Sequence, residues 1–201
     1  MSATLRVVTP AELMAELARR EQEYRHELER LIKTQERVRA DLLTWMAAGE
    51  DANTAADRTL AKLERQQKHV AGRAAGLGTQ VSEILREMEI NRMLEAGARR
   101  RLDEGVARPL ADLGRRRMPA AVERIAALGD ASAASEARAV DRALGQIVAE
   151  MRRIAANMVK WEGFQEAVTL LRDILELQGE VHDETQEALE RKLREIFGTN
   201  P

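Results

Sequence analysis

Hydrophobic residues recur along this chain in alternating steps of three and four positions, the spacing of a stripe on one face of an α-helix. The clearest stripe runs for more than four heptads through the first quarter of the chain, and only two of its positions are polar. The period-two alternation of β-strands is almost absent, so the pattern predicts paired helices. This first stripe consists of Met14, Leu17, Glu21, Tyr24, Leu28, Leu31, Gln35, Val38, Leu42 and Trp45.

Local signals predict where this helix starts and how the chain continues. Thr9 can cap the N-terminus, Pro10 suits the first helical position, and Glu12 lies three residues after the cap, as a capping box requires. Gly49 marks the end and opens a short turn. A second unbroken stripe then predicts an antiparallel hairpin over residues 10–91. That stripe consists of Ala56, Leu60, Leu63, Gln67, Val70, Ala74, Leu77, Val81, Ile84, Met88 and Asn91.

Three glycines, Gly72, Gly76 and Gly78, interrupt the second helix near its middle. Each costs about 1 kcal/mol of helix stability relative to alanine. Their spacing also permits two backbones to approach closely, but we expect a weak point or bend in preference to a specific crossing.

Residues 92–130 form a less regular segment that contains two prolines. Proline removes a helical hydrogen bond and bends or ends a helix, so Pro109 and Pro119 predict one or two bent helices over residues 98–128. Gly129 and the small residues that follow it predict the longest connection in the chain. The apolar face of this segment consists of Leu94, Leu102, Val106, Leu110, Leu113, Val122, Ile125 and Leu128.

The last segment, residues 131–201, is expected to form long helices that pack on the bundle. Two apolar stripes run along this segment, a main stripe and a companion beside it. The spacing of the companion stripe shifts by one residue between Trp161 and Phe164, and we interpret this shift as a break in the helix at Gly163 rather than a bend. After the slip a second apolar row widens the face, so the helix over residues 164–197 is expected to touch at least two neighbours. The main stripe is Val140, Ile147, Ile154, Trp161, Val168, Leu175, His182, Leu189 and Ile196, and the second row is Ala167, Leu170, Ile174, Leu177 and Val181.

Composition favours narrow helix–helix seams over a wide interior. Of the 201 residues, 44% are hydrophobic but only 2% are aromatic, so the apolar side chains are mainly aliphatic. We predict an all-α, elongated antiparallel bundle of four to five long helices in one domain, preceded by an extended segment, residues 1–9. Within that segment Thr4–Val8 is the only strand-like stretch, and we interpret it as a frayed terminus because a lone strand has nothing to pair with.

Several classes of protein are disfavoured. The sequence has no cysteine, so disulfides, thiolate nucleophiles and cysteine-based metal sites are excluded. The longest stretch without a charged residue, Ala74–Ser82, is about half the length that spans a bilayer. Residues Met1–Arg6 lack the layout of a secretory signal, so no export signal is expected. The compartment stays open between the cytoplasm and a soluble domain of a larger membrane-anchored protein.

Groups that could converge for catalysis or metal binding are scarce. Glu23 and His26 form one Glu-x-x-His unit, half of the motif that binds two metals in di-iron bundles. His69 and His182 have no glutamate three residues earlier, so we interpret Glu23 and His26 as surface residues. No phosphate-binding loop, nucleophile elbow or His-Glu-x-x-His motif occurs. We therefore expect no enzyme activity, no cofactor, no bound metal and no small-molecule substrate.

The middle of the chain is a basic island, although 32 basic and 34 acidic residues nearly balance overall. Residues 92–128 carry nine basic and five acidic residues, whereas residues 129–201 carry nine and fourteen. Consecutive arginines fan out by about 100° around a helix, and Asp103, Glu104 and Asp112 lie among them, so a self-paired surface is the first interpretation. Docking against the acidic last third and binding of nucleic acid or an anionic surface are the alternatives. The candidate anion-binding residues are Arg99, Arg100, Arg101, Arg108, Arg115, Arg116 and Arg117.

Two stretches near the ends of the chain carry a family resemblance. The first is Val7-Val8-Thr9-Pro10-Ala11-Glu12-Leu13 with the run Arg19-Arg20-Glu21-Gln22-Glu23, and the second is Lys160-Trp161-Glu162-Gly163-Phe164-Gln165-Glu166-Ala167-Val168 with Leu170-Leu171-Arg172-Asp173-Ile174-Leu175. They resemble the start and the closing helices of the helical region in certain large, membrane-anchored bacterial proteins of unassigned function. In such proteins this region follows extracytoplasmic domains, so the resemblance implies an interaction or spacer module.

These patterns together predict a non-catalytic interaction or scaffold module that acts through helix–helix contacts. Its partner would be another protein or a second copy of the chain in a homodimer. Binding of polyanions through the region Arg99–Arg117 is the alternative. Polar residues in the stripes, Glu21, Gln35 and Gln67, are expected to set the register of the helices at some cost in stability.

Overall fold

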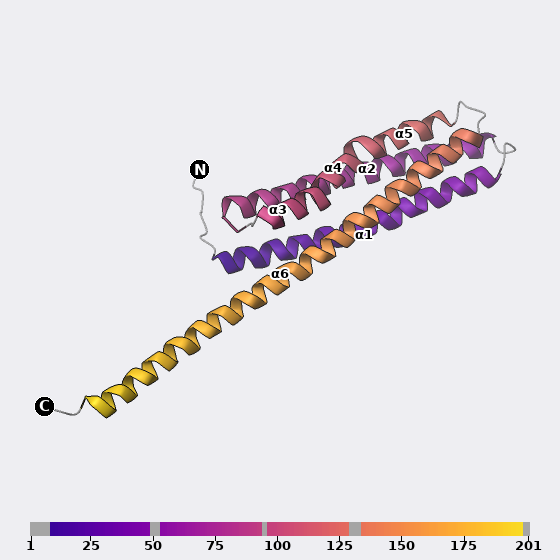
Figure 1. The fold of residues 1–201 in the computed structure, drawn as a ribbon. Coiled ribbons are helices and arrows are strands. Elements are labelled where there is room, and N and C mark those ends of the chain that lie inside the picture. Colours follow the sequence, from indigo (N-terminus) through magenta and orange to yellow (C-terminus); the bar gives the residue numbers. More distant parts are fainter. Residues whose placement is uncertain (1–8, 49–52, 94–95, 129–133, 199–201) are drawn as a thin grey trace, which may run out of the picture. The chain divides into compact units, whose positions relative to one another are not determined.

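The computed structural model describes residues 9–48, 53–93, 96–128 and 134–198, and nearly all of them are helical (Figure 1). No strand occurs among these residues, so the predicted all-α class is confirmed. None of the described helices is both long and apolar enough to cross a membrane. The elements are α1 (Pro10–Ala48), α2 (Asn53–Ile90), α3 (Ala96–Leu102), α4 (Arg108–Asp112), α5 (Met118–Ala127) and α6 (Ala134–Phe197), with π-helical turns at Asp103–Ala107 and Leu113–Arg117.

The chain divides into two compact units, residues 1–159 and residues 160–201. The boundary between the two units lies inside residues 131–201, the last segment predicted from the sequence. Three predicted features fall outside the described residues: the strand-like stretch before Thr9, the first part of the turn after Ala48, and most of the connection after Leu128.

The predicted capping box at the start of α1 is confirmed. The Thr9 N–H donates a 2.8 Å hydrogen bond to Oε2 of Glu12, and the Glu12 N–H donates a 3.2 Å bond to Oγ1 of Thr9. The bond from the Thr9 backbone lowers the pKa of Glu12 below its usual value of 4.5. The backbone N–H groups of Thr9 and Glu12 are thus both satisfied.

In the first unit α1 and α2 lie side by side as an antiparallel hairpin (Figure 1). Arg20, near the start of α1, pairs with Glu87, near the end of α2, at 3.0 Å. At the opposite end Asp41 of α1 pairs with Lys62 of α2 at 3.1 Å. The apolar stripes of both helices supply the core, with Leu17, Leu28, Leu31, Val38, Leu42, Leu60, Leu63, Val70, Ala74, Leu77, Val81, Ile84 and Met88 buried.

Two glutamines in the stripes pair with each other across the hairpin. Gln35 and Gln67 are both 0% exposed. Nε2 of Gln35 donates to Oε1 of Gln67 at 2.7 Å, and Nε2 of Gln67 donates to Oε1 of Gln35 at 3.0 Å. Because any slip of one helix along the other would leave both buried amides without these partners, the pair favours one register. Glu21, the third polar residue of the stripes, is also buried.

The segment from Asp103 to Ala127, which comprises the two π-helical turns with α4 and α5, packs along α2. The chain stays helical through Pro109 and Pro119. A π-helical turn ends two residues before each of these prolines. In these turns the N–H of Arg108 donates to the carbonyl of Asp103, and the N–H of Met118 donates to that of Leu113, five residues back in each case. The wider turn absorbs the disturbance that a proline ring causes in regular α-helix.

The helix α2 is continuous past its three glycines, and at Gly78 it forms the close crossing that the sequence analysis had placed second to a weak point or bend. A Cβ added to Gly78 would lie 2.9 Å from the backbone nitrogen of Ala111, and one added to Gly114 would lie 2.3 Å from that of Ala75. Two Ala-x-x-Gly sequences, at residues 75–78 and 111–114, therefore meet backbone to backbone. Gly72 has no atom within 4 Å of an added Cβ, so it takes no part in this crossing.

The first part of α6, up to Val159, completes the first unit. Its Asp141 accepts a 2.6 Å hydrogen bond from Nε of Arg39 on α1, which raises the pKa of that guanidinium. Arg152 also reaches α1, donating to Glu36 at 2.8 Å. The apolar side chains of both stripes in this part are buried as predicted: Val140, Ile147 and Ile154 of the main stripe, and Leu144, Met151 and Met158 of its companion stripe.

The break predicted at Gly163 is wrong, because α6 is helical without interruption from Ala134 to Phe197. A single glycine costs only about 1 kcal/mol in a helix, too little to end one of this length. Among the described residues of the second unit, α6 is the only element.

Candidate interaction surfaces

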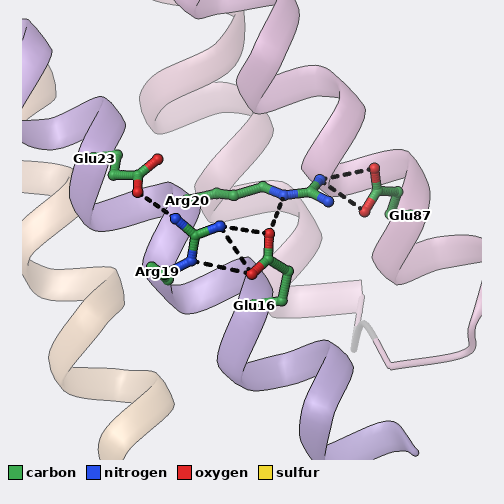
Figure 2. A network of polar contacts seen from close by, with 5 residues as sticks. All are labelled: Glu16, Arg19, Arg20, Glu23 and Glu87. Carbon is green, nitrogen blue, oxygen red and sulfur yellow. Dashed lines mark hydrogen bonds and ion pairs between the residues drawn. The ribbon is translucent and has the colours of Figure 1, made fainter. Parts of the chain in front are cut away.

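Charged side chains connect α1 to α2 near the start of the hairpin (Figure 2). Oε1 of Glu16 accepts hydrogen bonds from Arg19 at 2.8 Å and from Arg20 at 3.1 Å. The guanidinium of Arg20 also donates to both carboxylate oxygens of Glu87, at 3.0 and 3.1 Å. The bonds from Arg19 and then Arg20 lower the pKa of Glu16. This arrangement is an ion-pair network within the fold.

The Glu-x-x-His unit of α1 is engaged within its own helix. Glu23 accepts a 2.5 Å hydrogen bond from Arg19 (Figure 2). Nδ1 of His26 lies 2.8 Å from the carbonyl oxygen of Gln22, one turn earlier. In the part of the chain that the structure describes, no three histidine, aspartate or glutamate residues gather in a way that could hold a metal ion.

Several of the candidate anion-binding arginines already have protein partners. Arg99 pairs with Glu89 of α2 at 2.9 Å, and Arg108 pairs with Asp103 at 2.7 Å. The guanidinium of Arg115 donates to Oγ1 of Thr79 at 3.3 Å. These contacts fix part of the basic island to acidic and polar groups of the same unit, which supports the interpretation of a self-paired surface.

The remaining arginines of the island differ in exposure. Arg100, Arg101 and Arg116 are exposed, whereas Arg117 is only partly exposed. Arg116 pairs with Asp112, one turn earlier, at 3.4 Å. The pKa of Glu150 on α6 is lowered chiefly by its hydrogen bond from Arg153 and to a lesser degree by the charge of Arg117.

The second unit presents an apolar surface of a different kind. Four aliphatic side chains that the sequence pattern assigns to a buried face are exposed: Leu170 by 63%, Ile174 by 42%, Leu177 by 59% and Val181 by 61%. We name these four residues the α6 row. Within residues 160–201 as described, no second helix is present to cover it. His182, in the neighbouring stripe, is exposed as well.

Charges lie unevenly beside the α6 row. Taking Ile174 and Val181 as heptad positions a, Glu180 and Glu187 occupy the g edge, and Gln178, Thr185 and Lys192 occupy the e edge. All of these edge residues are exposed. One side of the row is thus acidic and the other is neutral to basic.

Comparison of the chain with protein-family models, with curated proteins and with solved structures found no match.

Proposed function

We propose that this protein is a non-catalytic interaction or scaffold module that acts through helix–helix contacts. The observation that carries the proposal is the α6 row, whose four aliphatic side chains are 42% to 63% exposed. The matching stripes of the first unit are buried against other helices of the same unit. Contiguous exposed apolar surface of this kind is typical of protein–protein interaction sites.

The mechanism follows from how an amphipathic helix binds. A row spaced by four, three and four residues presents one narrow stripe that fits the groove between side chains of another helix. The helix supplies a rigid support, and the partner covers the apolar area that water otherwise contacts. The first unit would then be linked through the chain to whatever the row binds.

The proposal is tested by capture with the full chain attached to a support at its N-terminus. We expect proteins retained from the native lysate to be lost when Ile174→Glu and Val181→Glu are combined, because two carboxylates in the row cannot be buried without partners. Asp183→Lys, an exposed position outside the row, is the control and should retain them. If the double variant and the original chain retain the same proteins, the row is not the interaction site.

Polyanion binding through the basic island is the competing function. It predicts that the chain binds heparin or DNA at about 50 mM salt and that affinity falls steeply as salt rises. Arg100→Gln combined with Arg101→Gln should then weaken binding. Undetectable binding at that low ionic strength would exclude this function.

A further inference from the structure

The α6 row has the side chains that favour a two-stranded coiled coil. Leu170 and Leu177 fall at heptad positions d, and the β-branched residues Ile174 and Val181 fall at positions a. β-Branched residues at a with leucine at d favour parallel dimers over larger assemblies. The neighbouring stripe is less suitable, because His182 lies between its two leucines, Leu175 and Leu189.

The edge charges of the row select one orientation for two identical helices. In a parallel pair the g edge of each helix faces the e edge of the other, which places Glu180 opposite Thr185 and Glu187 opposite Lys192. In an antiparallel pair the g edges face each other, so the acidic edge of one helix lies against the acidic edge of the other. Like charges in such positions destabilise the pair, so the antiparallel arrangement is disfavoured.

We propose that the partner of the α6 row is a second copy of this chain, and that the two copies join through a parallel coiled coil centred on Ile174 and Leu177. This inference rests on the proposed function and names its partner. The seam is short, since Glu184 occupies the next d position and Ala188 the next a position. We therefore expect a dimer that dissociates on dilution.

Sedimentation equilibrium of the full chain tests the stoichiometry. Between roughly 5 and 200 µM, a range suited to micromolar affinity, the mass should rise from 22.5 kDa towards twice that value. Leu177→Glu should weaken association at least about 100-fold, since each dimer would bury two facing carboxylates. Leu175→Glu is the matched control, because Leu175 is 66% exposed but lies in the neighbouring stripe. It should change the dissociation constant by less than about threefold.

Both variants replace exposed leucines outside the buried core of the first unit, so loss of folding does not explain a difference between them. A chain that stays monomeric up to about 200 µM, where micromolar complexes form, would overturn the inference. So would an assembly larger than a dimer, or dissociation by Leu175→Glu with no effect of Leu177→Glu.

Cysteine cross-linking tests the orientation, and the natural chain contains no cysteine that could interfere. In a parallel dimer Val181→Cys places the two thiols opposite each other, so oxidised glutathione should give a covalent dimer. Asp183→Cys places them on the outer faces and should give little. Equal cross-linking of both variants would overturn the parallel arrangement.

Failure of the dimer and failure of the proposed function give different results. The original chain could be monomeric while the Ile174→Glu and Val181→Glu variant still fails to capture the proteins that the original chain retains. The partner of the row is then a different protein and not a second copy of this chain. A dimer that is unaffected by substitutions in the row would contradict the coiled-coil dimer, whereas capture that is unchanged in the Ile174→Glu and Val181→Glu variant would contradict the proposed function.

Discussion

Asn157 on α6 donates a 3.0 Å hydrogen bond from Nδ2 to the backbone carbonyl of Gly105. That carbonyl lies four residues before Pro109, which has no N–H and cannot supply the usual helical donor. The side chain also packs closely on the glycine, since a Cβ at Gly105 would lie 3.3 Å from Nδ2. A side chain from another helix thus replaces the hydrogen bond that the proline removes.

Asn157→Ala should therefore lower the free energy of unfolding by about 1 to 3 kcal/mol, the cost of leaving a partly buried acceptor without its donor. In a Pro109→Ala background residue 109 regains its N–H, so the loss should be smaller by at least about 0.5 kcal/mol. Urea unfolding of the four proteins in this cycle provides the measurement. Equal losses in both backgrounds would show that Asn157 does not compensate for the proline.

The backbone crossing of α2 with the segment before α5 predicts opposite effects for two identical substitutions. Gly114→Ala should destabilise the protein by about 3 kcal/mol or more, because the added Cβ meets backbone atoms of Ala75 that cannot rotate away. Gly72→Ala, with open space around it, should stabilise the protein by about 0.5 to 1 kcal/mol. Thermal unfolding by circular dichroism compares them. The crossing is wrongly placed if both variants melt at or above the original temperature.

These helices show which parts of the fold can be predicted from the sequence and which cannot. The burial of Leu28, Gln35 and Gln67 is predictable, because a helical stripe fixes which residues face a neighbour. The crossing of Gly78 on Ala111 is not, since its partners lie 33 residues apart and no local signal states which helix meets which. The prediction of a break gave too much weight to Gly163, because the low helix propensity of a single glycine is too small an effect to end a long continuous helix.

The candidate surfaces show the same limit. Periodicity identifies Leu170 and Ile174 as members of an apolar row but cannot say whether the same unit covers them. The arginine triplets are visible in the sequence, whereas the contact between Arg99 and Glu89 depends on how two helices meet in space. Patterns predict faces, and only the arrangement of elements determines what those faces contact.

The buried glutamine pair predicts a non-additive effect on stability. Gln35→Leu alone should cost about 1 to 3 kcal/mol, because it leaves the buried amide of Gln67 without a partner. The double variant with Gln67→Leu should recover most of this loss, since two apolar groups then pack together. Denaturant unfolding of the single and double variants measures the coupling. Additive losses would mean that the hydrogen bonds contribute little.

The carboxylate of Glu16 gives the fold a dependence on pH. Its pKa is lowered in the folded chain by hydrogen bonds from Arg19 and Arg20, relative to 4.5 without them. A group with a depressed pKa stabilises the fold above pH 4.5, and this contribution is lost as pH falls below that value. The melting temperature should therefore decrease from pH 6 to pH 3 less steeply in Glu16→Gln than in the original chain. Parallel curves for the two proteins would contradict the assignment.

Hydrogen exchange at different protein concentrations tests most directly whether the α6 row is covered by association. Backbone amides of residues 170–188 should exchange several-fold more slowly at about 200 µM than at about 5 µM, because pairing stabilises the helix. Amides of residues 63–81, in the buried part of α2, provide the internal control and should exchange at the same rate at both concentrations. Identical exchange of residues 170–188 at the two concentrations would contradict self-association through the row.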